Sequence, residues 1–137
     1  MRWTVEDMEK FEQEREFVDT ALIPIFSFPM DQVSLDVTKE QKWLEEICVY
    51  AERQLTGRVL LLPTLYVIDQ EWPLNSVTIS SFPIVQFVTT NEQLQEKLGQ
   101  LNVPVYLLER KEQEDDLTEM VREGKKLTKR IMEQWKN

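Results

Sequence analysis

The sequence of 137 residues contains no histidine, the side chain that proteins use most often as a general base and as a metal ligand. Mechanisms that depend on a histidine are therefore excluded within this chain. Cys48 is the single cysteine, which excludes an intramolecular disulfide, a CxxC redox pair and a zinc site built from several cysteines. With only three glycines, no GxGxxG or GxxxxGK[ST] pattern occurs, so the common dinucleotide and phosphate cradles are absent.

Long apolar runs are also absent. The two most apolar stretches, residues 20–30 and 58–68, contain prolines and are far shorter than the ~20 residues that a membrane-spanning helix needs. The first residues turn acidic at once and lack the apolar region of a signal peptide. We therefore expect a cytoplasmic protein with no membrane span.

Positive charge is scarce, and the formal net charge is -9. An acidic chain opposes non-specific binding to nucleic acid, because that affinity rests on cationic contacts to phosphate. The densest basic cluster, residues 125–130, follows a run of acidic residues in the segment 112–135. This order suits the dipole of a helix, so we expect no nucleic-acid partner.

The composition, 42% hydrophobic and 30% charged, is typical of a soluble globular protein. The length fits a single domain, residues 1–137, with one core. Four segments show helical periodicity, and three of them begin at a residue suited to capping. The predicted helices run from Thr4 to about Asp19, from Thr38 to Gly57, from Thr90 to about Gly99, and over residues 112–135.

Apolar stretches typical of buried strands lie between these helices. We predict strands over residues 20–28, 58–62, 84–88 and 103–108, a short extra strand over 77–80, and an irregular loop over 63–76. Pro24 is the one awkward residue, because it has no N–H for a sheet. The alternation predicts an α/β fold, a three-layer open sheet of about four to five mostly parallel strands with four helices.

Ligands of such sheets bind beyond the carboxyl ends of the strands, and polar residues follow each predicted strand. Trp72 stands out because it lies in the longest loop, where an aromatic side chain could anchor a partner. The alternative is that these residues cap helices and face water. The candidate ligand-binding residues are Asp31, Ser34, Asp36, Asp69, Glu71, Trp72 and Thr90.

The sequence offers no catalytic residue, metal site or cofactor site. Its serines have no histidine to activate them, and no SxxK pattern supplies a lysine instead. Cys48 lies on the apolar stripe of a predicted helix, where a buried structural thiol is expected rather than a nucleophile.

The segments TALIPIF, KEQKWLEEI and GRVLLLPTLYV, with the acidic N-terminal helix, resemble the YpiF-like family of uncharacterised bacterial proteins over the whole chain. That family has no assigned activity. The resemblance therefore implies a domain of unknown function and adds no mechanism.

Residues 20–80 also resemble the N-terminal part of the creatininase-type amidohydrolases, metal-dependent enzymes with an α/β fold. Their first strand ends in a pattern like IPxGSxEQHGxHLPxxTD, whose opening matches the segment IPIFS at residues 23–27. In this register Pro29 takes the place of the metal-binding glutamate, and Asp31 and Ser34 take those of two histidines. Common descent would therefore imply a shortened relative that has lost the metal ligands.

Three functional hypotheses follow. The leading one is a non-catalytic protein that binds a protein partner or a small molecule at the strand ends. The alternative is a divalent-metal hydrolase that uses the carboxylates of Asp31, Asp36, Asp69 and Glu71, because Mg²⁺, Mn²⁺ and Ca²⁺ take oxygen ligands. The third is a self-associating scaffold or homodimer, since the edges of an open sheet can pair.

Overall fold

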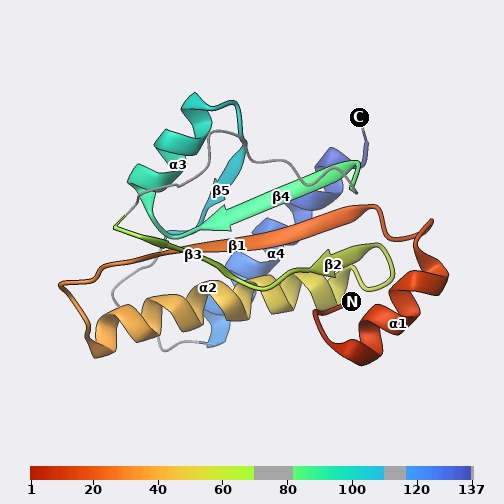
Figure 1. The fold of residues 1–137 in the computed structure, drawn as a ribbon, viewed down its shortest axis with the longest axis horizontal. Coiled ribbons are helices and arrows are strands. Elements are labelled where there is room, and N and C mark those ends of the chain that lie inside the picture. Colours follow the sequence, from red (N-terminus) through yellow and green to blue (C-terminus); the bar gives the residue numbers. More distant parts are fainter. Residues whose placement is uncertain (70–81, 110–116, 137) are drawn as a thin grey trace.

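The structure is a computed structural model that describes residues 1–69, 82–109 and 117–136. Within these ranges the chain forms helices on both sides of one five-stranded sheet (Figure 1). The elements follow one another as α1 (Val5–Glu14), β1 (Thr20–Phe28), α2 (Leu35–Gln54), β2 (Val59–Leu61), β3 (Leu65–Ile68), β4 (Ile84–Thr89), α3 (Glu92–Gln100), β5 (Val105–Leu107) and α4 (Leu117–Gln134).

Each pairing within the described sheet is parallel. The strand order is β2-β1-β4-β5, and β3 also pairs with β1. β2 lies beside the first residues of β1 and β3 beside its last residues, so β2 and β3 together form one interrupted edge. The predicted α/β fold with a mostly parallel sheet is confirmed.

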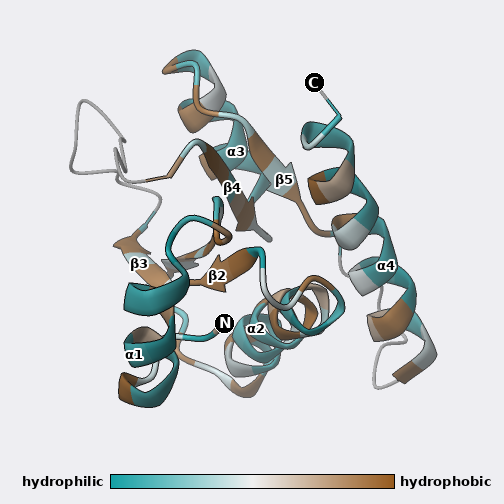
Figure 2. Ribbon diagram, turned by 90° about the vertical axis from the view of Figure 1, so that its right-hand side faces the viewer, coloured by the Kyte–Doolittle hydropathy of each residue, from teal (hydrophilic) through white to brown (hydrophobic). Residues whose placement is uncertain are grey.

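The helices cover both faces of the sheet. Side chains of β1 alternate between them: Leu22 and Phe26 pack with α2 and α4, whereas Ala21 and Ile23 pack with α3. A third cluster joins α1 to β2 on the α3 side, through contacts of Phe11 and Leu60. Figure 2 shows the resulting three layers, with α2 and α4 on one side and α1 and α3 on the other. Among the described residues, none of the helices has the length and apolar character needed to cross a bilayer.

The break between β2 and β3 resolves the difficulty at Pro24. From Leu61 to Leu65 the edge advances by four residues while β1 advances by three, as in a β-bulge. The carbonyl of Leu22 accepts a hydrogen bond from the N–H of Leu62. Because alternate residues of a parallel strand face the same neighbour, Pro24 faces the break, where the ladder is already interrupted.

β3 corrects the sequence prediction, which placed residues 63–76 in an irregular loop. Three of its four residues are exposed, so the segment lacks the buried pattern by which the other strands were recognised. The predicted strand over residues 77–80 lies outside the described residues.

Two predicted helix starts and one helix end were also wrong. Helix α2 begins one turn earlier than predicted, because the Ser34 hydroxyl accepts the N–H of Val37; Thr38 lies inside the helix and donates its hydroxyl to the Ser34 carbonyl. Helix α3 is capped by the side chain of Asn91, not by Thr90. Helix α1 ends at Glu14, before the predicted end at about Asp19.

A cluster at the amino end of the sheet holds the last turn of α4. The guanidinium of Arg58 lies 3.1 Å from the Asp19 carboxylate and 3.9 Å from the centre of the Trp135 ring. The Trp135 indole donates to the Thr20 hydroxyl, at 2.8 Å, and that hydroxyl donates to Asp19, at 2.9 Å. The sequence did not indicate this cluster, because its members lie far apart along the chain.

The stability of the protein should depend on pH through Asp19. Burial raises the pKa of its carboxyl, but hydrogen bonds from Arg58 and Thr20 outweigh burial and leave the pKa below its ordinary value of 3.8. Because folding lowers this pKa, the ionised carboxylate stabilises the fold at pH values above the ordinary pKa. This contribution disappears as the pH falls through the folded-state pKa. We expect Asp19→Asn to lower the urea midpoint at about pH 7 and to differ less from the wild type at about pH 3. A difference that stays constant over this range would contradict the prediction.

Candidate functional site

The carboxyl ends of the strands gather at one side of the molecule, on the left in Figure 1. The edge formed by β2 and β3 lies on one side of β1, and β4 lies on the other. The chain thus passes to opposite sides of β1, which creates a topological switch point. In open α/β sheets, ligands bind in the crevice outside the carboxyl ends of the strands at such a point.

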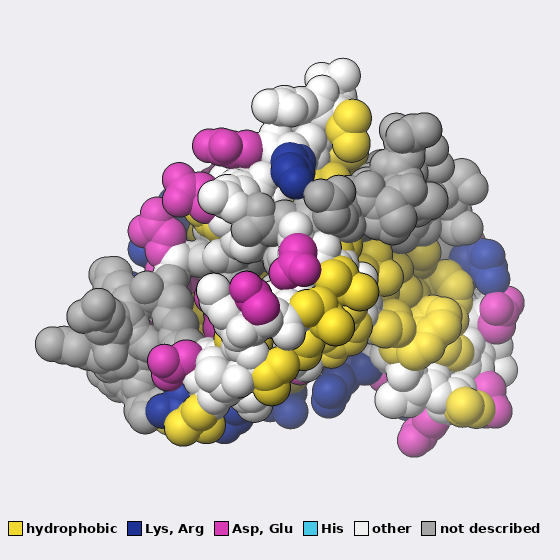
Figure 3. Space-filling view, turned by 60° about the vertical axis from the view of Figure 1, so that its left-hand side comes forward, with side chains coloured by type: hydrophobic (Ala, Val, Ile, Leu, Met, Phe, Trp, Pro, Cys, Tyr) yellow, Lys and Arg dark blue, Asp and Glu magenta, His cyan; other side chains and the backbone are white. Residues whose placement is uncertain are grey.

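A pocket of about 480 Å³ lies at this position. Its walls come from the end of β1 and the loop after it, the first turns of α2, the end of β3 and the residue that caps α3. Figure 3 shows this side of the molecule, where acidic side chains stand beside a patch of hydrophobic ones. The pocket is lined by Ser27, Pro29, Asp31, Gln32, Asp36, Val37, Glu40, Asp69 and Asn91.

Three of the predicted residues meet in this pocket: Asp31, Asp36 and Asp69. Ser34 and Thr90 are not among its lining residues. The hydroxyl of Ser34 caps α2 instead. Glu71 and Trp72 lie outside the described residues, so their predicted roles stay predictions.

Local backbone geometry positions the pocket residues. Asp69 has a φ of 48°, in the left-handed region that Asp and Asn tolerate better than most side chains. One of its carboxylate oxygens accepts the backbone N–H of Met30, at 3.2 Å, which ties the end of β3 to the β1–α2 loop. Asn91 uses its side-chain oxygen to cap α3, at 2.8 Å from the N–H of Leu94.

The pocket is acidic. Four carboxylates contribute to its lining, and its described walls contain neither lysine nor arginine. Within the described part of the chain, no three acidic side chains form a group that could hold a metal ion. The arrangement favours a ligand with a diffuse positive charge over one that needs three oxygen ligands at short distance.

Ser27 and Glu40 also line the pocket, although neither was predicted from the sequence. A signal existed for Glu40, because it follows Asp36 by four residues and therefore lies on the same face of α2. For Ser27, the available signal is its place at the next-to-last position of β1, beside the carboxyl end of the strand.

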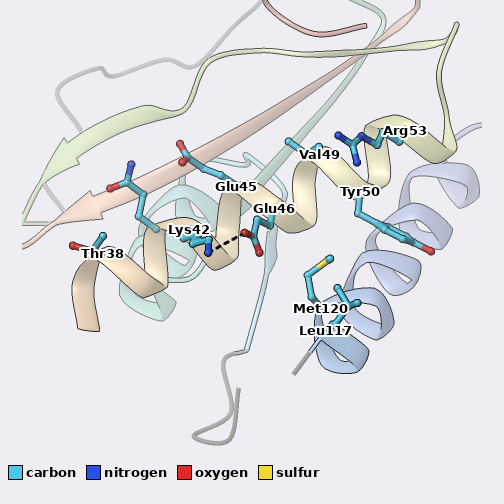
Figure 4. A pocket seen from close by; sticks show the side chains of 10 residues that line it. Thr38, Lys42, Glu45, Glu46, Val49, Tyr50, Arg53, Leu117 and Met120 are labelled. Carbon is cyan, nitrogen blue, oxygen red and sulfur yellow. Dashed lines mark ion pairs between the residues drawn. The ribbon is translucent and has the colours of Figure 1, made fainter. Parts of the chain in front are cut away.

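A second pocket, of about 570 Å³, lies between α2 and α4 (Figure 4). Its lining combines charged residues of α2 with the apolar side chains of Leu117 and Met120. Lys42 and Glu46 form an ion pair across one turn of α2, at 3.5 Å. Acidic and basic side chains are mixed here, so this pocket has no net preference for one charge.

Polar contacts join α2 to the edge strand. Gln41 donates to the Tyr66 hydroxyl at 2.8 Å, and the Thr64 hydroxyl donates to the Glu45 carboxylate at 2.6 Å. Burial and the nearby charge of Glu45 raise the pKa of the Tyr66 phenol. The phenol therefore stays protonated at neutral pH and can also donate to the Glu45 carboxylate, at 3.5 Å.

The profile of a family described as "Protein of unknown function (DUF2487)" matches residues 9–135. The chain belongs to the DUF2487 family. This DUF2487 chain is also 28% identical over 112 residues to the uncharacterised protein YpiF of Bacillus subtilis (strain 168), which covers 75% of the chain and 76% of YpiF. The predicted membership of a YpiF-like family is confirmed.

No solved structure matches the DUF2487 chain. The resemblance to creatininase-type amidohydrolases is not confirmed by the family match or by the similarity to YpiF. The site of this DUF2487 protein therefore has to be interpreted from its own geometry.

Proposed function

We propose that this DUF2487 protein is a non-catalytic binding protein that takes an ammonium or guanidinium group in the acidic pocket at the carboxyl ends of β1 and β3. One observation carries the proposal: Asp31 and Asp69 line a pocket at the topological switch point whose described walls have no basic side chain. A cation in this pocket would be attracted by both carboxylates at once. The net charge of -9 would also steer a cationic ligand toward the protein.

An ammonium or guanidinium group can come from two sources. The group is either part of a free polyamine or a lysine or arginine side chain of a partner protein. The hydrophobic patch beside the acidic side chains (Figure 3) favours a partner that adds apolar contacts, since apolar burial supplies most of the affinity of protein interfaces.

The proposal is tested by titrating the protein with three probes at constant ionic strength: spermidine, an acetylated penta-arginine peptide and Mg²⁺. Binding is followed by two-dimensional NMR, so that the responding residues are identified. The test variant is Asp31→Asn combined with Asp69→Asn. Asparagine tolerates the positive φ at residue 69 and keeps an oxygen for the Met30 N–H, so this variant removes charge without removing the loop contact.

We expect saturable binding of spermidine or the peptide, with shifts at Asp31, Asp69 and Asn91, and a loss of about tenfold in affinity in the double variant. The control variant, Glu9→Gln combined with Glu6→Gln, changes the net charge equally on exposed positions of α1 and should change affinity by less than about twofold. Equal weakening in both variants, or no saturable binding of either probe, would overturn the proposal. A response to Mg²⁺ alone would favour the metal-hydrolase alternative.

A further inference from the structure

The edge strand β3 is exposed in a way that the other edges of the sheet are not. Among the described residues, β1 is the only strand paired with β3. Tyr66 and Ile68 are each 54% exposed, and Leu65 is 39% exposed. Figure 2 shows β3 as a hydrophobic segment at the outer end of the sheet.

Backbone groups at other edge positions of the sheet have partners. At β2 the carbonyl of Met1 accepts the N–H of Leu61 at 2.8 Å, and Arg2 forms a parallel bridge to the same residue. At β5 the side chain of Gln95 donates to the carbonyl of Val105, at 3.2 Å. Proteins usually protect sheet edges with such contacts, with charges or with prolines, yet β3 itself carries no charged residue and no proline.

The register of the sheet shows which backbone groups of β3 are directed outward. The N–H of Asp69 donates to the Phe28 carbonyl of β1. Because alternate residues of a parallel strand face the same neighbour, Val67 also directs its backbone groups toward β1. Tyr66 and Ile68 therefore direct their N–H and C=O groups away from the sheet.

We propose that β3 pairs with β3 of a second copy of this chain, antiparallel, about a two-fold axis that passes midway between the two copies of Val67. A two-fold axis perpendicular to the sheet reverses the direction of a strand, so two copies of β3 that share such an axis pair antiparallel, with the same segment of both copies in the interface. With the axis at Val67, Tyr66 of one copy lies opposite Ile68 of the other.

This register gives a partner to the outward N–H and C=O groups of both Tyr66 and Ile68. Tyr66 and Ile68 of opposite copies exchange both backbone hydrogen bonds, and the symmetry produces that exchange twice. Their side chains lie on one face of the joined sheet, as an aromatic and a β-branched residue that pack well across strands. The register also places Asp69 opposite Leu65 of the second copy, so no two carboxylates face each other.

The oligomeric state is measured by sedimentation equilibrium of the full chain from about 5 µM to about 500 µM, a range that suits a short interface. We expect a monomer–dimer equilibrium that Ile68→Lys weakens by at least about tenfold, because a lysine at the edge blocks strand pairing. The control, Phe17→Lys, makes the same charge change at a side chain that is 63% exposed away from the edge. Both variants reduce the net negative charge, so weaker dimerisation cannot come from an increase in the net charge of the copies.

A cysteine crosslink tests the register itself. In a Cys48→Ala background, Val67→Cys should form an intermolecular disulfide under oxidised glutathione, because residues opposite each other in a non-hydrogen-bonded pair lie ~4.5 Å apart between Cα atoms. Leu65→Cys should not, since residue 65 lies opposite residue 69 of the second copy.

A monomer at every concentration would overturn the proposal. It would also be overturned by a dimer that Ile68→Lys leaves intact, or by crosslinking of both cysteine variants to the same extent. Because neither the pocket variants nor the pocket probes enter this experiment, its failure would leave the cation-binding proposal to be judged separately.

Discussion

Glu52→Ala is expected to lower the free energy of unfolding by about 3–5 kcal/mol, the range for breaking one partner of a buried ion pair. The Glu52 carboxylate lies 3.1 Å from the α-ammonium of Met1, and the two side chains are only 5% and 8% exposed. The same ammonium donates to the Val59 carbonyl at 2.7 Å. Removal of the carboxylate would leave a buried positive charge that a single carbonyl cannot compensate.

Urea unfolding followed by circular dichroism measures this loss. The matched control is Glu46→Ala on the same helix, because Glu46 pairs with Lys42 on the surface, where both side chains are well exposed. Surface pairs contribute at most about 1 kcal/mol. Glu52→Gln should have an intermediate effect, since its amide oxygen still accepts from the ammonium. Equal losses for Glu52→Ala and Glu46→Ala would show that the buried pair has no special role.

Gly124→Ala is the second large effect, and we expect a loss of about 1–3 kcal/mol even though alanine favours helices. Gly124 lies in α4 against the ring of Tyr50 in α2. A Cβ at this position would clash with Cδ1 of that ring and lie 2.8 Å from its Cγ. These atoms are close to the α2 backbone, so the ring cannot move aside without shifting the helix or changing its rotamer.

The control is Gly99→Ala in α3, where an added Cβ meets no atom within 4 Å and should raise stability by up to about 1 kcal/mol. A double variant tests the mechanism: if the clash with Tyr50 causes the loss, then Gly124→Ala should cost little in a Tyr50→Ala background. An undiminished cost in that background would place the cause elsewhere.

The fold class was predictable because most strands are continuous apolar runs and most helices have an amphipathic period, and both patterns come from burial. β3 was missed for the same reason, since Leu65, Tyr66 and Ile68 are exposed and leave no burial pattern. The start of α2 was misplaced because two overlapping segments satisfy the capping rules. Thr38 with Gln41 matches a capping box, but the helix begins one turn earlier, where Ser34 is the N-cap residue.

The candidate site was predictable in part. Asp31, Asp36 and Asp69 follow from the rule that loops after parallel strands converge, and this rule needs only the strand ends. Glu40 lies inside the helix predicted from Thr38, whereas Asp36 precedes that predicted start, so the rule did not include Glu40. The cluster of Asp19, Arg58 and Trp135 depends on how α4 crosses the sheet, which single-sequence patterns do not encode.

The contact between Trp135 and Thr20 joins residues that are 115 positions apart. Long-range contacts slow folding, because the chain must close a large loop before they form. During synthesis, the apolar face of β1 and α2 would lack its cover until α4 has left the ribosome. The nascent chain would then expose residues such as Phe26 and Leu44 that are fully buried in the finished fold. Synthesis of α4 would thus shorten the time during which this apolar face is open to aggregation.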